Sequence, residues 1–86
     1  MKKIVINPGE ALPNHYHEKK HETFHIIEGY GTAILDGVSQ RVKPGDTLLI
    51  PPGMRHSIVT FGLIPIILIE ASTPHIEDST REALLL

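Results

Sequence analysis

Residues 9–29 read GEALPNHYHEKKHETFHIIEG, and the rest of the 86-residue chain can be arranged around them. His15 and His17 are one residue apart, so in an extended segment both imidazoles point to the same face. Glu22 opens a run of β-branched and aromatic residues, TFHIIE, that predicts a strand. We therefore expect His15, His17 and Glu22 to converge from two neighbouring strands.

Two imidazole nitrogens and one carboxylate oxygen are a donor set typical of a metal site. Neutral imidazole and carboxylate together favour a divalent Zn, Fe, Mn, Ni or Cu ion over Ca or Mg. Three ligands leave the coordination shell incomplete, so a further ligand is expected from elsewhere in the chain.

The composition restricts the class of protein. A chain of 86 residues forms one domain with a core of marginal size, and without cysteine it has no disulfide to stabilise it. The remaining sources of stability are a bound metal, an oligomer interface, or both. The net charge of −2 is spread without basic clusters, so the expected partner is a small molecule or another protein and not nucleic acid.

The N-terminus gives no sign of targeting. Its apolar run is broken by Asn7-Pro8-Gly9, too early for a signal peptide, and no later stretch approaches the length of a membrane span. We therefore expect a cytoplasmic protein with no membrane partner.

Short β-like runs separated by turns fill the chain as far as the tail. Asp36-Gly37 between two such runs is a strong hairpin signal, because a type I′ turn needs positive φ at both central residues. The spacing predicts an all-β sandwich or small barrel. The predicted strands are Ile4–Ile6, Glu22–Glu28, Thr32–Leu35, Val38–Val42, Thr47–Ile50, His56–Thr60 and Leu63–Ala71.

The last predicted strand has two unusual features. Pro65 lies inside it, which indicates an edge position or a bulge. Residues Ile66–Ile69 are all apolar, so the side chains on both faces of this strand should be covered. We expect a second subunit of a homodimer to cover the outer face. The tail, residues 72–86, ends in Leu84-Leu85-Leu86 and is expected to dock or swap onto a partner, or else to fray.

Two groups of fixed positions make the chain resemble the cupin superfamily, in particular its small single-domain members. The first group is Gly9, His15, His17, Glu22 and Gly29. The second is Gly45, Pro51, Gly53 and His56, with Thr60 at the closing position that is usually Asn. The resemblance implies a double-stranded β-helix, or jelly roll, forming one domain over residues 1–86, with core motifs at 9–29 and 45–60 and a short tail.

The resemblance also implies one metal, held by His15, His17, Glu22 and His56, and so supplies the missing ligand. A shell of three nitrogens and one oxygen leaves one or two positions open for water, substrate oxygens or O2. His21 and His25 are out of phase with Glu22, and we expect them on the outer face or at a subunit interface.

Counting by twos from the ligands predicts a mostly apolar cavity wall. The wall consists of Phe24, Ile26, Leu48, Ile50, Ile58 and Thr60. No motif supplies a second titratable group for proton transfer, so catalytic residues are left unassigned. Arg41 and Arg55 are the only basic candidates nearby, and for Arg55 a solvated turn position is preferred to a role in holding a carboxylate or phosphate.

Three kinds of function fit these features. One is a metal-dependent enzyme, either an Fe-dependent dioxygenase or a sugar or sugar-phosphate isomerase. The segment from Ile66 to Arg81 is similar to the end of cupin-type mannose-6-phosphate isomerase domains, although the spacing from the His pair to Glu22 differs. The alternative is a non-catalytic module that binds or senses a small molecule through the metal. A third possibility is a structural metal that stabilises a dimer.

Overall fold

The structure is a computed structural model that describes residues 1–15, 18–60 and 62–72, with the side chains of residues 13–15 outside the description. Within these ranges every regular element is a β-strand. The described residues contain no helix long and apolar enough to cross a membrane. The predicted all-β class is confirmed.

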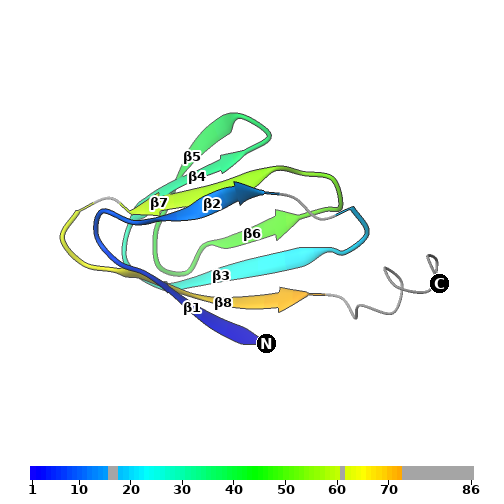
Figure 1. Ribbon diagram of the computed structural model, residues 1–86. Helices are drawn as coiled ribbons and strands as arrows, with labels where there is room; N and C mark the ends of the chain where they lie inside the picture. The colour runs from blue at the N-terminus through cyan, green and yellow to red at the C-terminus, as the bar shows by residue number, and fades with distance from the viewer. Residues whose placement is uncertain (16–17, 61, 73–86) are drawn as a thin grey trace.

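The described residues form eight strands in two antiparallel sheets that lie face to face (Figure 1). The first sheet contains, in spatial order, β1 (Lys2–Ile6), β8 (Ile66–Ser72), β3 (Glu22–Glu28) and β6 (Thr47–Ile50). The second contains β2 (Ala11–His15), β7 (His56–Thr60), β4 (Gly31–Leu35) and β5 (Val38–Val42).

The chain winds between the two sheets as it proceeds. Only the β4–β5 hairpin stays within one sheet, and every other step from one strand to the next changes sheet. This winding is the double-stranded β-helix, or jelly roll. It places the end of β2 and the starts of β3 and β7 at one end of the sandwich, on the right of Figure 1.

Inward-facing apolar side chains from both sheets make the core. Along β3 the buried and exposed positions alternate, so Glu22, Phe24 and Ile26 face inward while His25 and Ile27 are exposed. β6 and the first four residues of β8 alternate in the same way. The core comprises Ile6, Phe24, Ile26, Ala33, Val42, Leu48, Ile50, Ile58, Ile66 and Leu68.

The β4–β5 hairpin forms at the predicted turn. Asp36 has a φ of 49° and Gly37 a φ of 81°, which are the positive values that a type I′ turn requires. The cross-strand register runs from Leu35↔Val38 to Gly31↔Val42 without a shift. The hairpin signal in the sequence is therefore confirmed.

The expectation for Pro65 is wrong. β8 begins at Ile66, immediately after Pro65, and lies inside its sheet between β1 and β3. Proline has no N–H to donate to a neighbouring strand, so the ladder starts after it instead of bending around it. The irregularity lies on the neighbouring strand, where the pairing of β3 with β8 shifts register between Ile26 and Glu28.

Two glycines allow the chain to change sheet between β3 and β4. Gly29 has a φ of 90°, and a Cβ there would overlap the carbonyl oxygen of Pro65. A Cβ on Gly31 would overlap the carbonyl oxygen of Val59. Because the backbones approach so closely, only glycine, which has no Cβ, fits at these two positions.

Candidate metal centre

Glu22 is the first residue of β3 and faces the interior at the same end of the sandwich as the start of β7. Only 4% of its surface is exposed. Phe24 and Ile26 are apolar and face the interior of the sandwich. Side chains of a strand alternate between its two faces, so Glu22, two positions before Phe24, faces the interior as well. A buried carboxylate of this kind requires neighbours that stabilise its charge or hold its proton.

His56 is held in place by the turns that precede β7. Arg55 N donates to Asp36 Oδ1 at 2.9 Å, and Asp36 N donates to the Arg55 carbonyl oxygen at 2.8 Å, so the tip of the β4–β5 hairpin is tied to the start of β7. The Pro51–Gly53 turn is closed by Met54 N donating to the Pro51 carbonyl oxygen at 3.2 Å. His56 is completely buried as a result.

The two buried side chains meet across the space between the sheets. His56 Nε2 lies 3.3 Å from Glu22 Oε1, and solvent reaches neither atom. His56 Nδ1 lies 3.1 Å from the Met54 carbonyl oxygen, which can only accept, so Nδ1 is the protonated nitrogen. In the neutral ring Nε2 then presents a lone pair to the carboxylate. The Phe24 ring packs edge-on against the imidazole, with centroids 5.6 Å apart.

This pair fits a metal ion. Two ligands bound at about 2.1 Å to one ion, at angles of 90° to 109°, lie about 3.0 to 3.4 Å apart. The 3.3 Å separation of Nε2 and Oε1 falls in that interval. Nε2 and Oε1 are both electron-pair donors, so a cation or a proton is expected between them. A metal-binding histidine usually donates its other ring N–H to a backbone carbonyl or carboxylate, as Nδ1 of His56 does to Met54.

The cupin-domain profile matches residues 2–71 of the chain, a range that includes Glu22 and His56. The chain belongs to the cupin family. The resemblance of its two motifs to the family is thereby confirmed.

Three similar proteins indicate the range of known relatives. An uncharacterized protein of Methanocaldococcus jannaschii is 32% identical over 80 residues, or 93% of this chain and 64% of that protein. Quercetin 2,3-dioxygenase of Bacillus subtilis is 41% identical over 49 residues, or 57% of this chain and 14% of that enzyme. The crystal structure of a predicted oxalate decarboxylase from Thermotoga maritima superposes with a TM-score of 0.78 at 26% identity, over 81% of this chain and 61% of that one. This cupin therefore spans less than two thirds of each of the three.

The other two predicted ligands of this cupin are only partly described. The backbone of His15 ends β2 and is paired with His56 in the register of β2 with β7. The side chain of His15 and the whole of His17 lie outside the described residues. Among the side chains that are described, no group of three or more His, Cys, Asp or Glu is placed to hold a metal. The four-residue ligand set therefore stays a prediction, of which the structure brings Glu22 and His56 together.

Glu70 is a residue of the candidate site that the sequence analysis missed. It lies on the interior strand β8, paired with Phe24 of β3, and its side chain hydrogen-bonds to Glu22. Burial of Glu22, followed by this hydrogen bond and the charge of Glu70, raises the pKa of Glu22 from 4.5 to about 7. Lys20 and Lys2 act in the opposite direction on the same pKa. The site therefore holds the second titratable group that the sequence motifs did not supply.

A signal for Glu70 existed in the sequence. Counting by twos from Ile66 and Leu68 leads to Glu70, but Ile67 and Ile69 are equally apolar, so the pattern alone does not say which parity faces inward. In the structure Ile66 and Leu68 are fully buried, whereas Ile67 and Ile69 are half-buried on the outer face. The sheet pairing decided which side Glu70 faces.

A cavity of about 210 Å³ opens beside Glu22. Its described lining is Lys2, Ile4, Leu12, Lys20, Glu22, Phe24 and Glu70. Lys20 is largely covered: 16% of its side chain is exposed, and its Nζ lies 3.9 Å from Glu22 Oε2.

The six residues expected in the cavity wall have different positions. Phe24 lines the cavity. Ile26, Leu48, Ile50 and Ile58 are buried in the core. Thr60 is half-buried near the other end of β7, where its hydroxyl accepts a hydrogen bond from Gly9 N at 3.1 Å.

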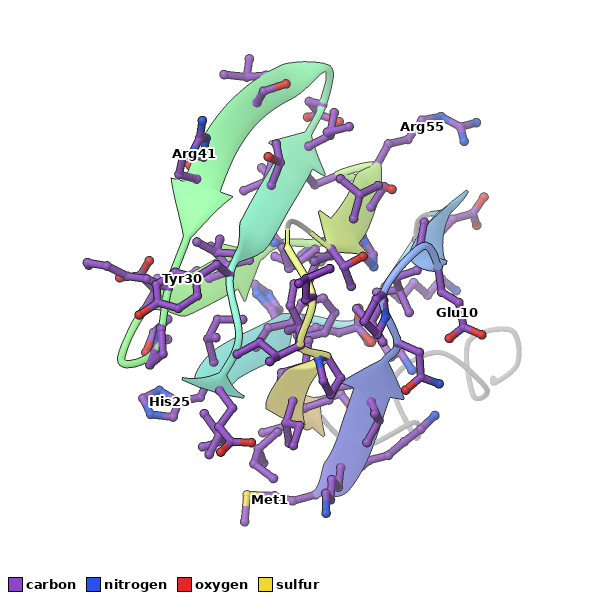
Figure 2. All side chains as sticks on the ribbon, turned by 90° about the vertical axis from the view of Figure 1, so that its left-hand side faces the viewer. Met1, Glu10, His25, Tyr30, Arg41 and Arg55 are labelled. Carbon is purple, nitrogen blue, oxygen red and sulfur yellow. The ribbon has the colours of Figure 1, made fainter. Side chains whose placement is uncertain are left out.

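The remaining histidines and arginines of the sequence analysis lie outside the barrel. His21 and His25 are exposed as expected, and His25 Nδ1 lies 2.9 Å from Thr47 Oγ1. Arg41 and Arg55 are also exposed and project away from the interior (Figure 2). Neither arginine is among the described residues that line the cavity beside Glu22.

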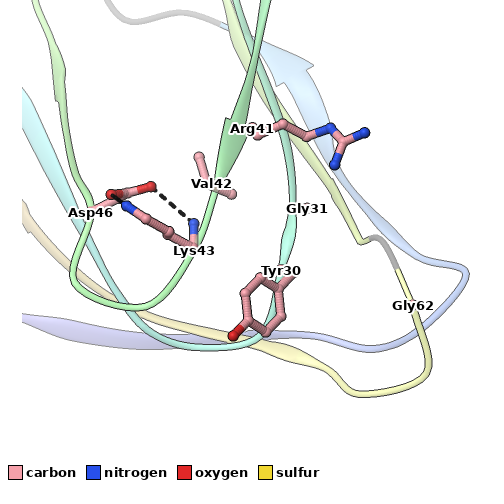
Figure 3. Close-up of a pocket in the computed structure, with 7 residues that line it drawn as sticks. All are labelled: Tyr30, Gly31, Arg41, Val42, Lys43, Asp46 and Gly62. Carbon is pink, nitrogen blue, oxygen red and sulfur yellow. Dashed lines mark hydrogen bonds and ion pairs between the residues drawn. The ribbon is translucent and has the colours of Figure 1, made fainter.

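A larger cavity of about 560 Å³ lies at the opposite end of β3 (Figure 3). Its described lining is Tyr30, Gly31, Arg41, Val42, Lys43, Asp46 and Gly62. Lys43 Nζ and Asp46 Oδ1 are 2.9 Å apart, so these two charges neutralise each other within the turn. Because none of these lining residues is a histidine or a second acid, size alone does not make this cavity the centre of chemistry.

Proposed function

We propose that this cupin binds a divalent transition metal through His15, His17, Glu22 and His56 and uses it to bind and transform a small organic molecule. The observation that supports the proposal best is the buried Glu22–His56 pair, with facing atoms 3.3 Å apart. When bound there, a metal with open coordination positions supplies a centre that holds and polarises the oxygen atoms of a ligand.

The residues around the pair have separable tasks. The Met54 carbonyl holds the His56 ring in the tautomer that points Nε2 at Glu22. Phe24 and Leu12 make part of the cavity wall apolar, which excludes water from the ligand. Glu70 shares a proton with Glu22 and lies in the same cavity, where it can give a proton to a ligand or take one from it.

A dioxygenase is the first candidate activity. The similarity to quercetin 2,3-dioxygenase, 41% over 49 residues, supports it, as does the partly apolar wall. A sugar or sugar-phosphate isomerase is the second, because Glu70 supplies the proton-transfer group that this chemistry needs. A metal-dependent binding module without catalysis is the alternative to both.

One set of measurements separates these candidates. Metal content is measured on the purified protein, followed by O2 consumption with small enediols and diketones and by isomer exchange with small sugars and sugar phosphates. Turnover that His56→Ala abolishes establishes an enzyme, and the assay in which it occurs names the class. Bound metal and ligand without turnover in either assay establishes the binding module. Absence of bound metal under every loading condition contradicts the proposal.

A further inference from the structure

Two lysines stand beside the two carboxylates of the candidate metal centre. Lys20 Nζ lies 3.9 Å from Glu22 Oε2. Lys2 is the first residue of β1 and is the cross-strand partner of Glu70 on β8. All four side chains line the 210 Å³ cavity. Lys2, Lys20 and Glu70 also line an adjoining hollow of about 270 Å³, so these three lie where the two spaces meet.

A bound divalent metal would give this group of charges a clear excess of positive charge. Lys2 and Lys20 supply two positive charges, and Glu22 and Glu70 supply at most two negative ones. A divalent metal at Glu22 and His56 adds two positive charges that none of the described cavity-lining residues offsets. In a half-enclosed site of reduced dielectric constant, such an excess attracts anions strongly.

The apolar and charged residues lie in different parts of this space, which favours one orientation of a bound anion. Ile4, Leu12 and Phe24 cover the inner part of the cavity, whereas Met1, Lys2, Lys20, Glu70 and Ser72 surround the adjoining hollow. A lysine ammonium is a compact charge on a flexible stem, so both lysines can turn toward an incoming ligand. The arrangement suits a molecule with oxygen atoms or a short carbon chain inside and an anionic group at the lysines.

We propose that Lys2 and Lys20 together bind an anionic oxygen group of the ligand, so that the molecule this cupin acts on is a small organic acid or a small phosphate ester. This inference rests on the proposed function, because the excess positive charge requires the bound metal. Carboxylate and phosphate offer the same anionic oxygens to an ammonium group, and the experiment distinguishes them.

The test measures binding to the metal-loaded, full-length protein by calorimetry. Malonate is compared with its neutral counterpart malonamide, and methyl phosphate with neutral trimethyl phosphate. The variants are Lys2→Gln and Lys20→Gln. Lys3→Gln is the matched control, because Lys3 is the next residue of β1 and lies on the opposite, outer face. Metal stoichiometry and Tm are recorded for each variant, so that loss of the metal or of the fold is seen separately.

In the wild-type protein, we expect at least one of the two anions to bind about tenfold or more tightly than its neutral counterpart. Lys2→Gln and Lys20→Gln should each weaken that anion about tenfold, while Lys3→Gln changes its affinity less than about twofold. The anion affected names the ligand class. Neutral counterparts that bind as well as the anions, or an anion affinity that neither cavity lysine alters, would overturn the inference while leaving the metal centre intact. Failure of the protein to bind metal would contradict both this inference and the proposed function.

Discussion

Glu22 is in contact with three different groups, and its properties depend on all of them. One oxygen faces His56 Nε2 at 3.3 Å and the other faces Lys20 Nζ at 3.9 Å, while Glu70 shares its proton. In the proposal, the metal competes with this proton for the carboxylate. The residue is therefore both a metal ligand in the proposal and the group that sets the pH range of metal binding.

Replacing Glu22 should weaken metal binding far more than replacing a histidine outside the barrel. We expect Glu22→Gln to lower metal affinity at least about tenfold, since a neutral amide oxygen replaces a charged ligand. His25→Ala is the control, because His25 is exposed and bonded to Thr47. Metal titration of both variants by calorimetry checks this. Equal losses in the two variants would refute the assignment of inward and outward faces on β3.

The metal-free protein should lose stability as the pH rises from 4.5 to about 7. The pKa of Glu22 is 4.5 in the unfolded chain and about 7 when folded, so between these values the folded state keeps a proton that the unfolded state releases. The number of protons bound is then higher in the folded state, and the free energy of unfolding falls as pH rises. Below 4.5 both states are protonated, and this contribution is fully present.

Thermal unfolding at several pH values, with the metal removed by a chelator, measures this effect. We expect the Tm of the wild-type protein to fall across that window relative to Glu22→Gln, in which the titrating group is absent. Metal affinity should change in the opposite sense and rise toward pH 7, because the metal needs the deprotonated carboxylate. Parallel pH profiles of Tm in the two proteins would show that Glu22 titrates normally.

At the scale of elements, the crossing from β3 to β4 is the most constrained connection. Gly29 and Gly53 have nearly the same φ, 90° and 85°, yet a Cβ on Gly29 would overlap the Pro65 carbonyl and one on Gly53 would meet nothing. We expect Gly53→Ala to cost about 1 kcal/mol for the backbone conformation alone. Gly29→Ala should cost more than about 2 kcal/mol, because steric overlap is added to the same strain. Denaturant unfolding compares the two variants, and equal costs would mean that the loop around Pro65 yields easily.

At the scale of the whole molecule, one sheet face carries several apolar side chains that solvent reaches. The outer face of the β1-β8-β3-β6 sheet carries exposed Val5, Ile27 and Leu49 beside half-buried Ile67 and Ile69. A chain of 86 residues without cysteine gains stability by covering such a face. We propose, as the sequence analysis expected, that a second copy of the chain covers it. The predicted tail interaction concerns residues outside the described ranges.

Light scattering during size-exclusion chromatography tests this proposal. We expect a dimer that Leu49→Lys dissociates, because a charge placed in an apolar interface must lose its hydration. Val38→Lys is the matched control, since Val38 is similarly exposed but lies on the β4–β5 hairpin of the other sheet. A chain truncated after Ser72 tests the other explanation, in which the tail of the same chain covers this face. A wild-type monomer whose truncated form self-associates would show that the tail, and not a second copy, covers this face.

The sequence by itself determined the all-β class, the hairpin at Asp36-Gly37 and the choice of Glu22 and His56 as candidate ligands. These follow from local rules: alternation with a period of two, backbone conformations that only certain residues adopt, and motif spacing that resembles a known family. Glu70, Lys2 and the covered position of Lys20 were decided only by the tertiary structure. Ile66–Ile69 is apolar on both sides, so no local pattern says that Glu70 faces inward. Only the pairing of β8 with β1 and β3 brings these residues together, because contacts between strands far apart in the chain depend on how the sheets close and not on spacing along the sequence.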